Sequence, residues 1–285
     1  MTQRAFIIPF ILLLSIVAGM PSEASERPTP DFMLDATTKM QGEFFVATVT
    51  GISSAPDFWF KEESFTMFRQ DNGSYRALVP VENMTRPGSY AFLVKKGKWE
   101  QKVPVGIEPN NLPVQKIWLD KKTNSLKATK EEKTQVKAAL RTLSDAKLWS
   151  GTFSYPCDGR KSSPFGVKRS YNGAPVSSYH KGLDIAVPRG TPVSSPANGK
   201  VVLTGYESNR FHVHGNTVVI DHGQGLTSIY MHLHTISVNE GDMLKKGDTL
   251  GTVGSTGIST GPHLHWGTYL YGTSVDPELL VSKEY

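Results

Sequence analysis

The placement of histidine restricts the fold of this 285-residue chain more than any other feature of its sequence. All eight histidines lie between His180 and His265, and the first 179 residues contain none. Neutral imidazole is the commonest protein ligand for zinc and the usual proton carrier near neutral pH. The clustering therefore predicts a metal or acid/base site in the C-terminal half, for which the fold must bring separate segments together.

Two of these histidines, His263 and His265, are two positions apart in a segment that favours extended structure. The residues after Trp266 are suited to a strand, and a turn rich in glycine, serine and threonine precedes them. Side chains at i and i+2 leave the same face of a strand, so both imidazoles should point into one groove. One can bind a metal while the other lies nearby for proton transfer, and the spacing alone does not decide which.

His180 and Asp184 supply two more candidate ligands. Their spacing would place them on one face of a helix, but Gly182 and the β-branched Ile185 argue against a helix here, so we expect a strand or a tight loop. Two histidines and one aspartate leave a fourth position open for water, which is the pattern of a catalytic zinc. Cys157 is the only cysteine, which excludes a cysteine-rich structural site and an internal disulfide.

Four phrases follow one another in the stretch Ser163–Trp266. They are HKGLDIAVPRGTPV (His180–Val193), NTVVIDHGQG (Asn216–Gly225), YMHL (Tyr230–Leu233) and GSTGISTGPHLHW (Gly254–Trp266). In order and spacing this stretch resembles the lysostaphin/LytM-type zinc peptidases, which cut peptide bonds in bacterial peptidoglycan. A lone HxxxD or HxH would be a weak signal, but four ordered phrases together are a specific one.

The resemblance implies both a fold and a function. It implies an antiparallel β-sheet with a long open groove, in which His180, Asp184 and His265 hold one Zn²⁺ per chain and His232 and His263 are the unligated catalytic pair. The expected activity is that of a zinc metalloendopeptidase acting on the stem or cross-link peptides of peptidoglycan. A zinc-activated water would attack, with the two histidines as acid/base and oxyanion stabilisers. Since the chain has no HExxH phrase, no glutamate is expected as general base.

The remaining histidines are expected to lie outside the site. We expect His222 to shape a turn at a strand end, and His212 and His214 to be solvated loop residues. His234 would share a strand face with His232, but the family phrase does not require it, so it is left out of the site.

The start of the chain predicts export. Arg4 precedes the apolar run Ala5–Ala18, and Ser22–Ala24 offers small residues for cleavage, so residues 1–24 are expected to be a signal peptide. A membrane anchor would need about 20 apolar residues, and this run is shorter and interrupted by Pro9. We therefore expect a protein of the periplasm, cell wall or extracellular space, with no stable membrane span after cleavage.

Residues 25–120 predict a separate β-rich accessory domain, a small β-sandwich. Glycine-containing turns at 71–73 and 95–97 lie between apolar runs and indicate two hairpins. The aromatic residues of the segment 44–60 could form a sugar-binding platform, but their place within strand runs favours core packing. We expect this domain to cover the zinc site in part and to lower activity until it is displaced. The alternative is that it only positions the enzyme on the wall.

Residues 121–150 read as a basic linker with a helix, followed by the peptidase domain over 151–285. Thr129–Glu132 is a capping-box pattern, and Val136, Leu140 and Leu143 form an apolar stripe at helical spacing. This linker carries eight basic and three acidic residues and accounts for the net charge of +5. No nucleic-acid motif accompanies that charge, so we expect no nucleic-acid partner, and we expect a monomer.

Two functional classes stay open besides the enzyme. A non-catalytic member of the same fold would act as a binding module or activator, although such relatives lack ligand or catalytic residues that this chain has. Hairpins in 191–203 and 238–253 also resemble lipoyl- or biotinyl-carrier hairpins, which would not explain the five placed histidine and aspartate residues. The sequence leaves undecided which peptide bond is cut, which of His232 and His263 is the base, and whether Tyr171 or Tyr179 assists the reaction.

Overall fold

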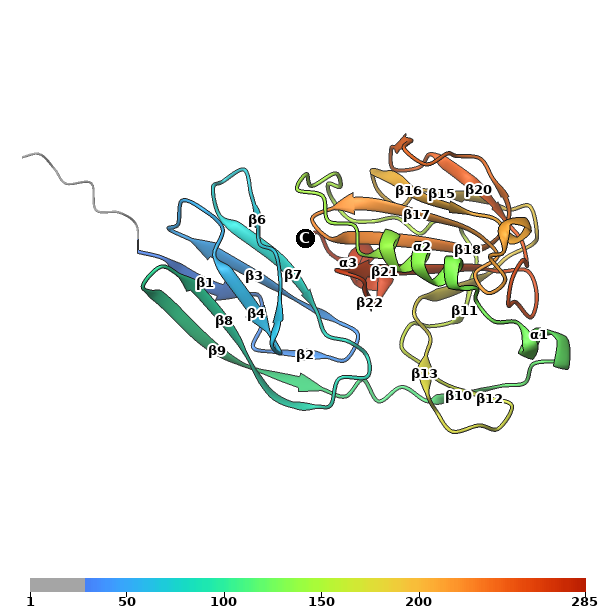
Figure 1. Ribbon diagram of the computed structural model, residues 1–285, viewed down its shortest axis with the longest axis horizontal. Helices are drawn as coiled ribbons and strands as arrows, with labels where there is room; N and C mark the ends of the chain where they lie inside the picture. The colour runs from blue at the N-terminus through green and yellow to red at the C-terminus, as the bar shows by residue number, and fades with distance from the viewer. Residues whose placement is uncertain (1–28) are drawn as a thin grey trace, which may run out of the picture.

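The computed structural model describes residues 29–285, which form two β-rich parts (Figure 1). They are joined by the connecting segment, residues 109–150. The expected signal peptide, residues 1–24, lies outside the described residues. Within 29–285, no helix has the length and apolar character needed to cross a membrane. The mainly β architecture expected from the sequence is confirmed.

The N-terminal part is a sandwich of two sheets. The first has the order β1 (Asp31–Leu34), β3 (Phe44–Thr50), β7 (Tyr75–Pro80), β6 (Phe68–Arg69). The second has the order β2 (Thr38–Met40), β9 (Trp99–Glu108), β8 (Gly88–Lys96), β4 (Asp57–Phe60), β5 (Glu63–Ser64). Both predicted hairpins are present, since β6 pairs with β7 and β8 pairs with β9, in each case antiparallel.

Aromatic rings fill the space between these two sheets. Phe58 and Phe60 stack on Phe92 with ring centroids 5.4 and 4.4 Å apart, and Phe45 meets Phe92 edge-on at 5.2 Å. All four side chains are at most 2% exposed. Such pairs add to the free energy of burial of their apolar surface. These phenylalanines are therefore core residues, which confirms the packing interpretation over a sugar platform.

The C-terminal part is built on one large antiparallel sheet. Its main path runs β11 (Arg160–Ser163), β14 (Leu183–Ala186), β21 (Leu264–Leu270), β18 (Leu226–Ile236), β17 (Asn216–Gly223), β16 (Gly199–Gly205), β19 (Met243–Leu244). Three more strands pair beside this path: β15 (Pro192–Ser194), β20 (Thr249–Val253) and β22 (Thr273–Val275). A 3₁₀ turn, η1 (Glu207–Asn209), precedes β17, and α3 (Pro277–Ser282) follows β22.

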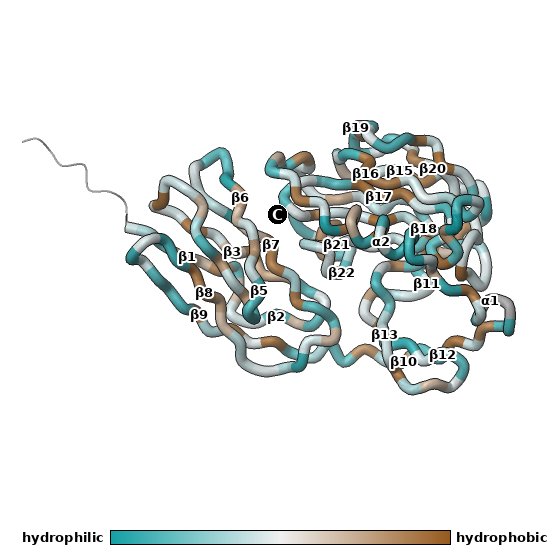
Figure 2. The backbone as a smooth tube through the Cα atoms, in the orientation of Figure 1, coloured by the Kyte–Doolittle hydropathy of each residue, from teal (hydrophilic) through white to brown (hydrophobic). Residues whose placement is uncertain are grey.

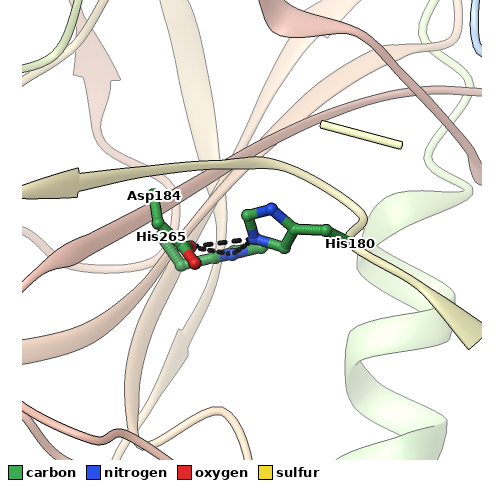
Figure 3. Close-up of side chains that lie close together, drawn as sticks. All are labelled: His180, Asp184 and His265. Atoms are coloured by element: carbon green, nitrogen blue, oxygen red, sulfur yellow. Dashed lines mark hydrogen bonds and ion pairs between the residues drawn. The ribbon is translucent and has the colours of Figure 1, made fainter. Parts of the chain in front are cut away.

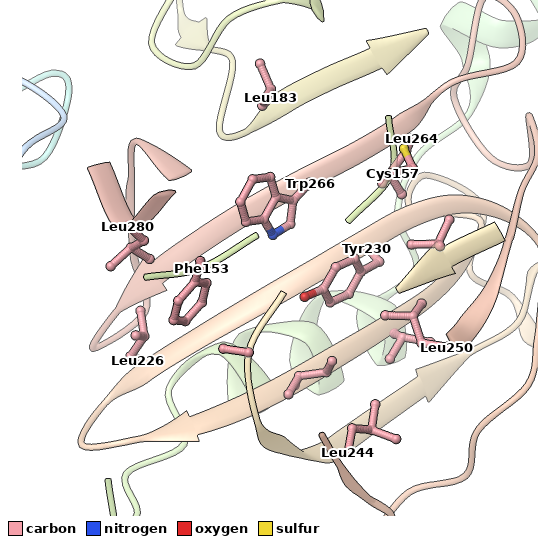
Figure 4. Close-up of a cluster of buried hydrophobic side chains, with 14 of the residues drawn as sticks. Phe153, Cys157, Leu183, Leu226, Tyr230, Leu244, Leu250, Leu264, Trp266 and Leu280 are labelled. Carbon is pink, nitrogen blue, oxygen red and sulfur yellow. The ribbon is translucent and has the colours of Figure 1, made fainter. Parts of the chain in front are cut away.

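Alternation along the central strands divides the sheet into two faces. Val218, Ile220 and Tyr230 lie on one face and belong to one core cluster with Trp266. Figure 4 shows Tyr230 and Trp266 within this cluster. Val219 points to the opposite face, as the period of two requires. Because both faces are covered, β17 and β21 are buried along almost their whole length. Apolar stretches accordingly follow β16 and β17 in Figure 2.

Helix α2 (Lys130–Leu140) covers part of the second face. Its capping box is present, with the Thr129 side chain accepting from the Glu132 N–H and the Glu132 side chain accepting from the Thr129 N–H. Val136 and Leu140 pack with residues of β16, β17, β18 and β21. The expected stripe is wrong for Leu143, which is 52% exposed, because the helix ends at Leu140.

Leu140→Ala should lower the free energy of unfolding by about 2–4 kcal/mol, because it removes a buried side chain from the contact between α2 and the sheet. Leu143→Ala is the matched control and should change it by less than about 0.5 kcal/mol. Urea unfolding of both variants measures the difference. Equal effects would show that the end of α2 does not contribute to the core.

The segment before α2 joins the C-terminal part as well. Strand β10 (Val114–Ile117) pairs in parallel with β12 (Lys168–Tyr171), which pairs with β13 (Ser178–Tyr179). The short helix α1 (Lys121–Ser125) then leads to α2. In Figure 1 this segment lies at the lower right, below the large sheet, before the chain reaches α2.

The sandwich packs directly on the large sheet. Phe44 and Leu78 belong to the core cluster of the C-terminal part, and the rings of Phe44 and Tyr285 are 4.6 Å apart. The hydroxyl of Tyr271 donates to the Thr66 carbonyl at 2.7 Å. These contacts hold the two parts in a defined relation.

Candidate metal centre

Neighbouring strands bring two of the proposed ligands together. Strands β14 and β21 are antiparallel, and Asp184 lies directly opposite His265 in their register. The neighbours of Asp184, Leu183 and Ile185, lie in the core of the first face. Asp184 and His265 therefore project from the second face, the one that α2 covers further along. Residues opposite each other on one face have close Cβ atoms, so strand pairing alone brings two of the three proposed ligands together.

His180 completes a compact cluster with Asp184 and His265 (Figure 3). The His180 Nε2 and His265 Nδ1 atoms each lie 2.9 Å from Asp184 Oδ1 and 3.0 Å from each other. Zinc with nitrogen and oxygen ligands at about 2.0–2.2 Å in tetrahedral order separates neighbouring ligand atoms by about 3.3 Å. The donor set and its spacing fit a zinc ion that has three protein ligands and one open position.

Hydrogen bonds behind His180 select its ligand atom. The His180 Nδ1–H donates to the Pro164 carbonyl at 2.8 Å, which leaves Nε2 unprotonated in the neutral ring. The segment that carries His180 packs closely against the segment that carries His265. A Cβ at Gly182 would lie 2.5 Å from the Trp266 carbonyl oxygen and 2.7 Å from His265 Nε2. Glycine is required at this position because no side chain fits between the two ligand segments.

Electrostatics keep the cluster in the protonation state that a metal requires. Burial opposes ionisation of Asp184, but its close contacts with His180 and His265 outweigh burial and hold the pKa of the carboxyl well below its usual range. Burial lowers the pKa of His265 to about 4. An ionised carboxylate facing a neutral imidazole is ready to bind a cation without first releasing protons.

Two supporting residues were missed by the sequence interpretation. Arg169 Nη2 lies 3.2 Å from Asp184 Oδ2, the oxygen that faces away from the two histidines. Gln115, in β10, accepts from Arg169 Nε at 3.2 Å. The connecting segment therefore orients a ligand through Arg169. No local pattern marks either residue, because their meeting depends on the pairing of β10 with β12.

His232 lies beside the cluster in an unusual backbone conformation. Its φ is +61°, in the left-handed region, and the register of β18 shifts just after it. The His232 Nδ1–H donates to the Thr256 carbonyl at 2.8 Å, so Nε2 is free to accept a proton. Burial, then the neighbouring His263 and His265, lower its pKa to about 3. The ring is thus a neutral base.

His263 faces His232 across the mouth of the cluster. Their ring centroids are 4.9 Å apart, and His263 Nε2 is 3.8 Å from Asp184 Oδ1. The His263 Nδ1–H donates to the Gly261 carbonyl at 2.8 Å. Both His263 and His265 thus point into one site, and His265 is the one in the ligand cluster.

These side chains open into a cleft of about 700 Å³. Asp184, His232, His263 and His265 line its metal end, and Gln115–Leu119 of the connecting segment line another side. Further lining residues are Asn124, Leu126, Arg169, Tyr171, Val213, Met231 and Ile258–Thr260. None of the described strands β1 to β9 lines the cleft. Within residues 29–120, only Gln115–Leu119 line the cleft, so the predicted cover of the site by this domain is limited to these residues.

The remaining histidines and the two candidate tyrosines lie in different surroundings. His222 lies near the end of β17, as expected, but it is fully buried and its Nδ1 hydrogen-bonds the carbonyl of Asn198 in a distant segment. His234 is exposed and absent from the cleft. The solvated interpretation is wrong for His214, whose Nδ1 lies 2.6 Å from Glu132 Oε1. Of the two tyrosines, Tyr171 lines the cleft, whereas the Tyr179 hydroxyl is bonded to Ser274 at 2.9 Å.

Three donor atoms that could hold a metal ion, with two further histidines beside them in an open cleft, fit the site of a hydrolytic metalloprotein. The sequence profile of peptidase family M23 matches residues 178–277. A crystal structure from Pseudomonas aeruginosa, of a protein assigned to peptidase M23, is 31% identical and superposes with a TM-score of 0.62. The alignment covers 83% of this chain and 92% of that one. The chain belongs to peptidase family M23, which confirms the resemblance.

Curated relatives match less than half of the chain. An uncharacterized metalloprotease of Haemophilus influenzae is 39% identical over 132 residues, which are 46% of this chain and 27% of the relative. The peptidoglycan DD-endopeptidase ShyA of Vibrio cholerae is 39% identical over 125 residues, 43% of this chain and 28% of the relative. The chain thus spans about a quarter of the length of these relatives.

Proposed function

We propose that this chain is a zinc metalloendopeptidase that hydrolyses peptide cross-links of bacterial peptidoglycan. The observation that carries the proposal is the convergence of one donor atom each from His180, Asp184 and His265 within 4.8 Å, at the end of an open cleft. Membership of peptidase family M23 supports peptide hydrolysis. The name of the Vibrio cholerae relative, a peptidoglycan DD-endopeptidase, supports the substrate.

We assign the chemical roles within this site as follows. A zinc ion held by His180, Asp184 and His265 would lower the pKa of a bound water to about 7 and polarise the scissile carbonyl. His232 or His263 accepts the proton of the attacking water at Nε2. The other donates to the developing oxyanion or to the leaving amine. The carbonyl partners of both Nδ1 atoms fix the tautomer that these transfers need.

The proposed substrate also requires a location outside the cytoplasm. The signal-like residues 1–24 support export to the periplasm, the cell wall or the extracellular space. Recovery of the mature chain from those fractions, with Ser25 as its first residue, checks this part of the proposal.

Purified peptidoglycan should release defined peptide-linked fragments when it is incubated with the mature, zinc-loaded chain. Mass spectrometry of the fragments identifies the bond that is cut. Removal of zinc by a chelator should stop the release, and added zinc should restore it, because the three ligands hold the metal that activates water.

The competing function is that of a non-catalytic binding module. It predicts no fragments from the zinc-loaded chain, together with retention of the chain on insoluble peptidoglycan. The presence of all five site residues favours the enzyme, since loss of cleavage would leave both free histidines without a role.

A further inference from the structure

Glu132 is buried more deeply than a helix cap requires. It is the third residue of α2, and its N–H donates to Thr129 Oγ1 at 3.0 Å, as in any capping box. Its side chain nevertheless has no exposed surface. A buried carboxylate is costly unless it is fully hydrogen-bonded, so its partners indicate what it holds in place.

Those partners are three consecutive N–H groups of the loop before β17. Glu132 Oε2 accepts from His212 N at 3.1 Å, and Oε1 accepts from Val213 N at 3.0 Å and His214 N at 2.8 Å. The His214 imidazole adds a fourth donor from this loop at 2.6 Å, besides the Thr129 N–H of the capping box. Burial opposes ionisation of Glu132, but the hydrogen bonds from His214 and Val213 outweigh it and lower its pKa to about 2. The ionised Glu132 carboxylate thus holds the loop 212–214 in place at neutral pH.

The same loop carries the contacts that hold His232. The His214 carbonyl accepts the His232 N–H at 3.1 Å. The Val213 carbonyl accepts the Ile258 N–H at 3.0 Å, which ties the loop to the segment whose Thr256 carbonyl accepts the His232 Nδ1–H. Both the backbone and the ring of His232 therefore depend on these segments. Its left-handed φ is disfavoured for a residue with a Cβ and persists only because the surroundings impose it.

We propose that Glu132 is a positioning residue of the metal centre, which fixes the backbone and ring orientation of His232 through the loop 212–214. The inference rests on the proposed function, in which His232 transfers protons. Glu132 lies outside the matched residues 178–277 and is absent from the cleft lining. The connecting helix therefore supplies part of the site although it touches none of the reacting groups.

Glu132→Gln in the zinc-loaded mature chain tests the proposal. Glutamine keeps the size but replaces one accepting oxygen with an NH₂ group, which cannot accept the loop N–H groups. With a soluble cross-linked muropeptide we expect kcat to fall about 10- to 100-fold, because a small displacement of a catalytic group is that costly. KM and zinc content should stay unchanged. Glu132→Asp, which keeps the charge on a shorter side chain, should recover part of the loss.

Two matched controls separate positioning from stability. Glu131→Gln removes a charge from the exposed neighbour on the same helix, and Thr129→Ala weakens the helix cap but keeps the Glu132 carboxylate. Both should retain kcat. A purely structural role of Glu132 would instead lower the melting temperature of Glu132→Gln and leave kcat of the folded fraction as it was.

Imidazole NMR of the zinc-loaded chain gives a readout that does not depend on hydrolysis. The His232 Nδ1–H should be protected from solvent exchange in the unaltered chain and in Glu131→Gln, and it should exchange at least about tenfold faster in Glu132→Gln. This measurement decides the proposal even when the unaltered chain cuts no peptidoglycan, which would refute only the proposed function.

If Glu132→Gln does not fold, His214→Ala takes its place, because it removes one donor to the same carboxylate. It should change kcat and the exchange of the His232 Nδ1–H in the same direction but by less. Unchanged kcat together with unchanged exchange of the His232 Nδ1–H in the folded variant overturns the proposal.

Discussion

Asp184→Ala should lose both the bound zinc and the hydrolytic activity. Asp184 Oδ1 lies 2.9 Å from a nitrogen of each ligand histidine, so its removal takes away the only negative charge of the cluster. It also leaves Arg169, which lies 3.2 Å from Asp184 Oδ2, as an unpaired cation beside the metal position. We expect zinc affinity to fall by more than the 10- to 100-fold that a supporting residue costs. Elemental analysis after dialysis measures the zinc content.

His234→Ala is the control for this prediction, since His234 is an exposed histidine of the same sheet that lies outside the cleft. It should keep one zinc per chain and full activity. Full zinc occupancy in Asp184→Ala would show that the ligand assignment is wrong.

His232→Ala and His263→Ala should retain zinc but lose about 10²–10⁴-fold in kcat, the contribution typical of a positioned acid or base. Each ring donates its Nδ1–H to a backbone carbonyl and keeps Nε2 for proton transfer. Neither belongs to the cluster of three donor atoms, so the metal should stay bound. Single-turnover cleavage of a soluble cross-linked peptide, with zinc content measured on the same samples, checks both statements.

A decrease of less than tenfold in both variants would assign the two histidines to support of the metal ligands and not to proton transfer. Loss of zinc in His263→Ala, with zinc retained in His265→Ala, would instead exchange their roles.

Much of this protein follows from short-range sequence patterns. Hairpin turns, the capping box before α2 and the alternation of His263 and His265 are properties of a few adjacent residues. They were therefore predictable without knowledge of the fold. The resemblance to a zinc peptidase family then supplied the full set of five site residues, including the choice of His265 over His263 as ligand.

The position of His232 could not be read from the strand pattern. Met231 pairs with His265, so regular alternation would turn His232 to the opposite face. The left-handed φ and the register shift in β18 bring it back toward the cleft. His232 is held there by hydrogen bonds that it donates to the carbonyls of Thr256 and His214, which are distant in sequence.

The sequence by itself determined the β-rich fold class, the hairpins and the residue types of the candidate metal centre, because these depend on local backbone preference and on ligand chemistry. Only the tertiary structure decided that Leu143 is exposed, that Gln115 and Arg169 support Asp184, and that Glu132 is buried against the loop of His214. The physical reason is that burial and hydrogen-bond partners are set by which distant segments pack together. Glu132 has the same local pattern as any capping glutamate, and nothing in the sequence signals that it will meet His212, which lies 80 positions further along the chain.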